Sequence, residues 1–185
     1  MKSETANFLR VDGTLLLLVD FQVKLARVMH DREILLENVR KLVKGMVALD
    51  VPVLWAEQNP DGLGPTVPEI AGFLAGEPVT KFSFSCCGEA RFTEALNRFG
   101  RGQILVAGIE THVCIYQTAV DLLREGYEVQ VVTDAVSSRT SQDKQIGLQK
   151  IKDAGGAWTS VETVLFELLK VAKGTKFKEI LKIVK

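Results

Sequence analysis

The chain has 185 residues, 46% of them hydrophobic, which is enough for one domain with a substantial core. Its 23 lysines and arginines balance 23 aspartates and glutamates, and no block of one charge stands out. These numbers disfavour a protein that binds nucleic acid or an acidic membrane surface.

Cysteine usage and the N-terminus indicate the compartment. The three cysteines, two of them adjacent at Cys86 and Cys87, lack the spacing of a disulfide framework or a zinc site. Residues 1–10 are polar and mixed in charge, unlike a secretory signal, and the apolar run 15–19 is too short to cross a bilayer. We therefore expect a soluble cytoplasmic protein.

Short apolar runs alternate with longer amphipathic segments along the chain. Residues 15–19 are apolar without alternation, which is typical of a strand buried on both faces of a parallel sheet. Residues 59–65 are rich in proline and glycine and indicate a loop. The expected strands span 14–20, 51–56, 79–84, 104–107, 128–133 and 157–160, and the expected helices span 33–49, 88–99, 111–124, 141–154, 161–171 and 176–184.

This alternation predicts an α/β fold, because parallel strands are joined by right-handed helical crossovers. We expect a three-layer, doubly wound, Rossmann-like architecture with helices on both faces of a parallel sheet. No repeat, low-complexity segment or linker divides the chain, so residues 1–185 are expected to form one domain.

Three chemically distinctive residues lie at or near the carboxyl ends of predicted strands, where open parallel sheets bind ligands. Asp20 ends the first strand, Lys81 lies on the third, and Cys114 follows the fourth at the start of a helix. A helix N-terminus and a nearby ammonium both lower the pKa of a thiol. A carboxylate within reach can take the thiol proton and later protonate a leaving group. The set therefore predicts a nucleophile, a base and an electrostatic partner.

Each of these residues also has a purely structural interpretation. Asp20 could cap the next segment, Lys81 could be a solvated charge on an edge strand, and Cys114 could be a packed thiol. The combination of acid, amine and thiol at one sheet edge favours the catalytic interpretation.

The two histidines argue against other chemistries. His112 lies two residues before Cys114, a spacing at which helical side chains do not face each other, so a Cys–His dyad is disfavoured. No His-x-His or Asp-x-His pair supplies a metal site, and we expect no cofactor. The stretch after Asp20 lacks Gly-x-Gly-x-x-Gly, which disfavours a dinucleotide-binding oxidoreductase.

Three motifs resemble the isochorismatase-like cysteine hydrolase superfamily. Residues 19–22 (VDFQ), Lys81 and residues 108–114 (GIETHVC) match its Asp, Lys and Cys landmarks in order. Residues 57–64 (EQNPDGLG) and 176–180 (KFKEI) resemble its isochorismatase domain-containing branch. The resemblance covers most of the chain and implies a six-stranded parallel sheet and a homo-oligomer.

The resemblance also implies a mechanism. Cys114 would attack a carbonyl carbon and form an acyl-enzyme, Asp20 would act as general base and acid, and Lys81 would hold the thiolate and orient Asp20. A cis peptide bond would join Ile109 to Glu110. The backbone N–H groups of Glu110 and Cys114 would form the oxyanion hole.

Two departures indicate the class of small-molecule substrate. Nicotinamidases of this superfamily carry an Asp-x-His pair and a further histidine, but residues 55–60 (WAEQNP) contain none. True isochorismatases cleave a vinyl ether and do not rely on the cysteine. Cys114 therefore favours hydrolysis of an amide or imide C–N bond.

Other residues near the strand ends are candidates for substrate binding, with core packing as the alternative. They are Phe21, Gln22, Trp55, Gln58, Phe82 and Tyr116. No role is assigned to Cys86 or Cys87.

A second hypothesis is a catalytically idle family member that acts as a binding or scaffold oligomer. The apolar residues of the predicted helix 161–171 could cover either an oligomer interface or the sheet. They are Val164, Leu165, Phe166, Leu168 and Leu169. The reactivity of Cys114 discriminates between an enzyme and a scaffold.

Overall fold

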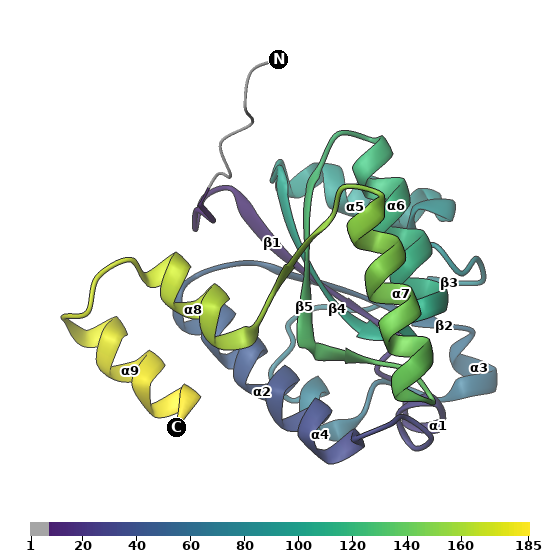
Figure 1. Cartoon of the computed structure of the whole chain (residues 1–185), viewed down its shortest axis with the longest axis horizontal. Coiled ribbons are helices and arrows are strands. Elements are labelled where there is room, and N and C mark those ends of the chain that lie inside the picture. Colours follow the sequence, from purple (N-terminus) through teal and green to yellow (C-terminus); the bar gives the residue numbers. More distant parts are fainter. Residues whose placement is uncertain (1–7) are drawn as a thin grey trace.

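A six-stranded sheet forms the centre of the computed structural model, which describes residues 8–185 (Figure 1). Every strand pairs in parallel with its neighbours, in the order β3-β2-β1-β4-β5-β6. The strands are β1 Thr14–Val19, β2 Val53–Gln58, β3 Val79–Lys81, β4 Gln103–Ile109, β5 Glu128–Ser137 and β6 Ala157–Thr159.

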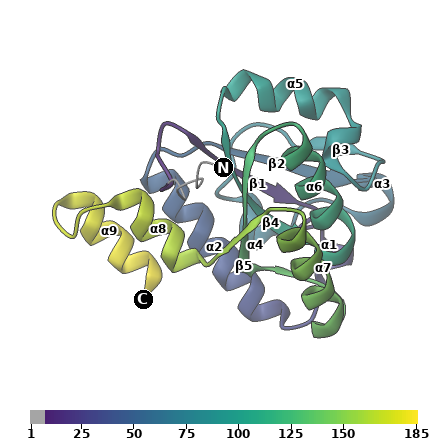
Figure 2. The same ribbon diagram turned by 45° about the horizontal axis from the view of Figure 1, so that its top comes forward.

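Helices cover both faces of this sheet, so the predicted doubly wound fold is confirmed (Figures 1 and 2). Helices α2, α8 and α9 lie on one face, and α5, α6 and α7 lie on the other. The helices are α1 Val23–Ala26, α2 Arg32–Ala48, α3 Pro60–Leu63, α4 Pro68–Ala71, α5 Ala90–Phe99, α6 Tyr116–Arg124, α7 Ser141–Asp153, α8 Val161–Leu169 and α9 Thr175–Val184.

Strand β1 contributes to two separate apolar clusters, one on each face of the sheet. Leu16 and Leu18 pack in the cluster on the α2 face, whereas Leu15 and Leu17 pack in the cluster on the α5–α7 face. Alternate side chains of a strand point to opposite faces. A central strand covered on both sides therefore has an uninterrupted apolar sequence.

The apolar residues of helix α8 pack against the body of the protein. Val164, Leu165 and Leu168 are buried in the cluster on the α2 face, and Phe166 and Leu169 pack against it. These side chains therefore cover the sheet.

Several elements differ from the predicted boundaries, among them β2, which was predicted at 51–56, and three further differences lie near the carboxyl edge of the sheet. Strand β3 ends at Lys81, because the chain then turns to surround the Lys81 ammonium. The predicted loop 59–65 contains the short helix α3, which begins at Pro60 because the fixed φ of proline suits the first helical position. Strand β5 continues to Ser137, beyond the predicted end at 133, after a register shift against β4.

Within residues 8–185, every helix is too short or too polar to cross a membrane. The first seven residues of the predicted polar N-terminus lie outside the described residues.

Candidate active site

Asp20 follows β1 directly, in the middle of the sheet. Its backbone has a φ of 59°, in the left-handed region that aspartate tolerates better than most residues with a side chain. Its N–H donates to the carbonyl of Ala56 on β2 at 3.1 Å. The side chain is fully buried.

Lys81 reaches Asp20 from the edge strand β3. Its Nζ lies 2.9 Å from Asp20 Oδ2, and both side chains are fully buried. The ammonium also donates to Gln58 Oε1 at 2.7 Å and to the carbonyls of Ser83 at 3.3 Å and Phe84 at 3.1 Å. The cation therefore has a complete set of oxygen partners despite its burial.

Cys114 lies in a π-turn, Thr111–Ile115, between β4 and α6. The turn follows Gly108, where a Cβ atom would lie 2.4 Å from the carbonyl oxygen of Val19, so only glycine allows β4 to approach β1 there. The side chain of Cys114 interacts with the carboxyl of Asp20, and the residue is 7% exposed. Asp20, Lys81 and Cys114 are thus brought together as predicted.

Burial dominates the electrostatics of this cluster. It raises the pKa of the Cys114 thiol, the charge of Asp20 raises it further, and Lys81 lowers it only in part. The sequence-based prediction of a lowered thiol pKa is therefore wrong, because it counted the ammonium and the helix but not the burial beside a carboxylate.

The two ion-paired groups respond differently to the same burial. Burial raises the pKa of Asp20, and Lys81 offsets this only partly. Burial by itself would lower the pKa of Lys81, but Asp20, Cys114 and Cys86 raise it above its usual value. Lys81 is therefore a permanent cation over the ordinary pH range.

The predicted substrate-binding residues divide into two groups. Phe21, Gln22 and Trp55 are buried, and the Gln22 amide bonds to the backbone of Gln58 and Gly64. Gln58 bonds directly to Lys81, as described above.

The remaining two predicted residues lie near the cluster along the chain and are more accessible. Phe82 is 70% exposed next to Lys81. Tyr116 is half-buried, with the ammonium of Lys150 lying 4.6 Å from its ring centroid.

Sequence reasoning missed the residues at the end of β5 that hold the π-turn. The Ser138 hydroxyl accepts from the N–H of Thr111 at 3.1 Å and lies 3.0 Å from His112 Nδ1. Arg139 pairs with Glu110 at 3.0 Å. No motif marked these residues, and the predicted β5 was too short to bring them to the sheet edge.

The peptide bond between Ile109 and Glu110 is cis, as the resemblance implied. His112 Nε2 lies 3.6 Å from Glu110 Oε2, and its other ring nitrogen is the one beside Ser138. The two ring nitrogens of His112 therefore face Glu110 and Ser138.

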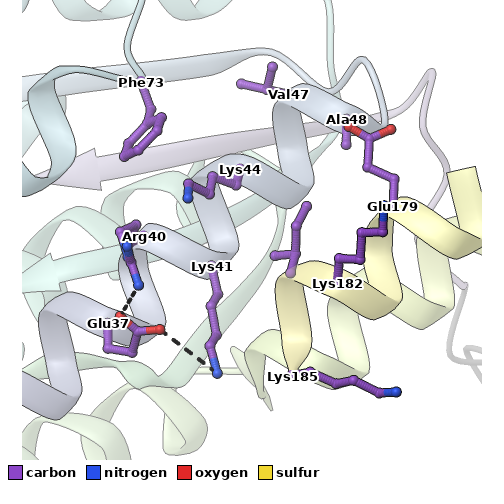
Figure 3. A pocket seen from close by; sticks show the side chains of 11 residues that line it. Glu37, Arg40, Lys41, Lys44, Val47, Ala48, Phe73, Glu179, Lys182 and Lys185 are labelled. Atoms are coloured by element: carbon purple, nitrogen blue, oxygen red, sulfur yellow. Dashed lines mark hydrogen bonds and ion pairs between the residues drawn. The ribbon is translucent and has the colours of Figure 1, made fainter.

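A groove of about 800 Å³ lies away from this cluster, between α2, α9 and Phe73 (Figure 3). Within it, Glu37 pairs with Arg40 and Lys41. Its lining includes none of the three clustered residues. Among residues 8–185, no group of three or more His, Cys, Asp and Glu side chains is arranged to hold a metal ion.

Fold and site together define a doubly wound α/β protein with an Asp–Lys–Cys cluster at the carboxyl edge of its parallel sheet. Residues 14–163 match the family model described as the isochorismatase domain, and the chain belongs to the isochorismatase family.

Curated proteins and solved structures agree with this assignment. Isochorismatase domain-containing protein 2 of Danio rerio is 38% identical over 95% of this chain and 88% of its own length. The MAR1 ribonuclease of Caenorhabditis elegans has a TM-score of 0.89 and 32% identity, covering 96% of this chain and 92% of that one. YcaC from Pseudomonas aeruginosa, solved with hexane-2,5-diol and covalent acrylamide, has a TM-score of 0.92 and 25% identity, covering 98% and 93%.

Proposed function

We propose that this protein is a cysteine hydrolase that cleaves the C–N bond of a small amide or imide through a thioester on Cys114. The observation that carries the proposal is the fully buried ion pair of Asp20 with Lys81 at 2.9 Å, placed so that the carboxyl also interacts with the Cys114 thiol. The covalent acrylamide in the YcaC structure supports only a reactive nucleophile in a protein of this fold, because acrylamide adds to thiols at its alkene carbon and keeps its amide intact.

In the first half-reaction, Cys114 Sγ attacks the carbonyl carbon while the Asp20 carboxylate takes the thiol proton. Burial raises the thiol pKa, which favours proton transfer to Asp20 during the attack. The N–H groups of Glu110 and Cys114 donate to the developing oxyanion. Asp20 then protonates the leaving nitrogen as the C–N bond breaks, and the acyl group remains on sulfur.

In the second half-reaction, Asp20 takes a proton from water, whose oxygen attacks the thioester carbon. The C–S bond breaks, the sulfur recovers the proton from Asp20, and the carboxylic acid leaves. Lys81 stays protonated throughout, since its pKa lies above the usual value. It compensates the negative charge that moves between Asp20 and Cys114.

The exposure of the candidate substrate-binding side chains indicates which of them could contact the substrate. Phe82 and Tyr116 are accessible enough to contact the bound molecule, and Gln58 presents its amide beside Lys81. Phe21, Gln22 and Trp55 support the strand ends from the interior. Because the cluster is almost closed, the substrate is a small molecule.

The test is a screen of small primary amides and imides for release of ammonia or carboxylate, comparing wild type with Cys114→Ala. We expect wild-type turnover, no turnover by Cys114→Ala, and an unchanged circular dichroism spectrum. Cys87→Ser is the matched control, because it removes another thiol and should leave turnover intact. Turnover by Cys114→Ala would contradict the nucleophile assignment.

The scaffold hypothesis keeps one specific observation in its favour. Phe82 and Phe84 are 70% and 56% exposed next to Lys81, and exposed aromatic residues of this size favour contact with another chain. We propose that the protein is a cytoplasmic homo-oligomer that covers these two rings. A monomer by sedimentation analysis would contradict this assembly, and the absence of turnover from the assembled protein would favour the scaffold.

A further inference from the structure

The ammonium of Lys81 depends on the segment that follows β3. Two of its partners are the carbonyls of Ser83 and Phe84, and these carbonyls lie on the loop 82–85. The loop 82–85 therefore supplies two of the four oxygen atoms around the cation, beside Gln58 and Asp20.

Glu89 holds this loop from the other side. Its Oε1 accepts hydrogen bonds from the N–H of Phe82 at 2.8 Å, the N–H of Ser83 at 3.0 Å and the Ser83 hydroxyl at 2.7 Å. Three donors on one carboxylate oxygen fix the first turn of the loop. Gly88 makes this arrangement possible, because a Cβ there would lie 2.7 Å from the Ser83 side chain.

The alternative role for Glu89 is to cap its own helix. Glu89 is the N-cap residue of α5, yet its side chain makes no capping hydrogen bond to that helix. The carboxylate bonds instead to the segment that contacts Lys81. This choice of partner separates Glu89 from an ordinary helix cap.

We propose that Glu89 is a positioning residue that fixes the Lys81 ammonium beside Asp20 and Cys114 by clamping the loop 82–85. The inference rests on the proposed function, in which Lys81 compensates the charge at Cys114. The chain of contacts is Glu89 to the Ser83 and Phe82 amides, the loop carbonyls to Lys81, and Lys81 to Asp20.

The test measures the rate of alkylation of each cysteine by iodoacetamide, using peptide mass mapping and no substrate. Lys81 lowers the pKa of Cys114, so displacement of the ammonium reduces the thiolate fraction. Glu89→Ala should slow Cys114 alkylation about tenfold at any pH below the thiol pKa, which corresponds to a rise of about one pKa unit. Glu89→Gln keeps the accepting oxygen and should slow it less than about threefold.

Three comparisons separate positioning from general loosening. Glu94→Ala removes an exposed glutamate from the same helix and should change nothing. Lys81→Ala combined with Glu89→Ala should react like Lys81→Ala alone, because Glu89 acts through Lys81. If Glu89→Ala does not fold, Ser83→Ala removes one of the three donors and should slow Cys114 alkylation severalfold.

The possible failures are distinguishable. Slow alkylation in Lys81→Ala but an unchanged rate in Glu89→Ala would overturn this inference alone. An unchanged rate in Lys81→Ala would overturn the electrostatic role of Lys81 in the proposed function. Faster alkylation of Cys86, Cys87 and Cys114 together in Glu89→Ala would show simple loop opening and also overturn the inference.

Discussion

The carboxyl of Asp20 is subject to two opposing effects. Burial raises its pKa, while the charge of the Lys81 ammonium, 2.9 Å away, lowers it. A general base works best when it is ionised at the working pH but still accepts a proton readily. The ion pair with Lys81 therefore favours the ionised form of this carboxyl, and burial opposes it.

Removal of the Lys81 charge should therefore raise the pKa of Asp20 further. In Lys81→Met, we expect the carboxyl carbon of Asp20 to titrate at a higher pH than in wild type, by NMR of ¹³C-labelled protein. Lys178→Met, which removes an exposed lysine, should leave the titration unchanged. An Asp20 titration at the same or lower pH in Lys81→Met would show that the ion pair does not control this group.

Glu89 should also contribute to acid stability. Hydrogen bonds from Ser83 and Phe82 lower its pKa from 4.5 to about 2, so the folded state favours the ionised form. The ionised carboxylate contributes fully to the free energy of unfolding above about pH 4.5. This contribution disappears as the pH falls toward 2. Urea denaturation should show wild type more stable than Glu89→Gln at about pH 7, and the difference should shrink at about pH 3. A difference that grows on acidification would contradict the lowered pKa.

At the scale of elements, the π-turn that carries Cys114 is packed tightly against helix α7. A Cβ on Gly147 would lie 2.6 Å from the carbonyl carbon and oxygen of Thr111 and 2.7 Å from the N–H nitrogen of His112. These are backbone atoms, which cannot rotate away as a side chain can. Glycine at this position therefore allows α7 to support the turn.

Gly147→Ala should displace α7 from the turn. We expect a loss of about 1–3 kcal/mol in the free energy of unfolding, typical of overpacking, and a strongly reduced rate of turnover. Gly102→Ala is the control, because its added methyl group would meet no atom within 4 Å. Gly147→Ala with wild-type stability and turnover would show that the turn adjusts without cost.

Sequence patterns predicted the elements built from regular periodicity but not the irregular ones. The uninterrupted run in β1 and the helical spacing in α2 determine the sheet and its cover, and Asp20, Lys81 and Cys114 follow from strand ends. The π-turn, the clamp by Glu89 and the contacts of Ser138 depend on tertiary hydrogen bonds. Such bonds leave no periodic pattern in the sequence. The pKa of the Cys114 thiol likewise depends on its burial beside Asp20, which sequence patterns do not predict.

At the scale of the whole molecule, the sheet separates two apolar clusters. Cys114 and Cys86 belong to the apolar cluster on the α5–α7 face, whereas α2, α8 and α9 pack on the opposite face. Helix α9 inserts Ile180, which is fully buried, into that second cluster. We therefore expect that a mutation in the cluster on the α2 face can lower stability without altering Cys114.

Ile180→Ala should test this separation. We expect it to lower the free energy of unfolding by about 2–4 kcal/mol, measured by urea denaturation, and to leave the iodoacetamide reactivity of Cys114 unchanged under native conditions. Ile146→Ala, at a side chain that is 48% exposed, should cost much less. A change in Cys114 reactivity in Ile180→Ala would show that the two faces are coupled.

The strand order imposes a length requirement on the cation. Strand β3 is separated from β1 by β2, and neighbouring strands lie about 4.8 Å apart, so the amine must cross roughly 10 Å of sheet to reach Asp20. An alkyl chain of four carbons with an ammonium at its end can approach across that gap, whereas a histidine ring at position 81 could not. Moving β3 along β2 by one residue would shift the amine by about 3.3 Å and turn it to the other face of the sheet. The spacing between strands thus restricts which amino acid can supply the positive charge at position 81, independently of the pKa of its side chain.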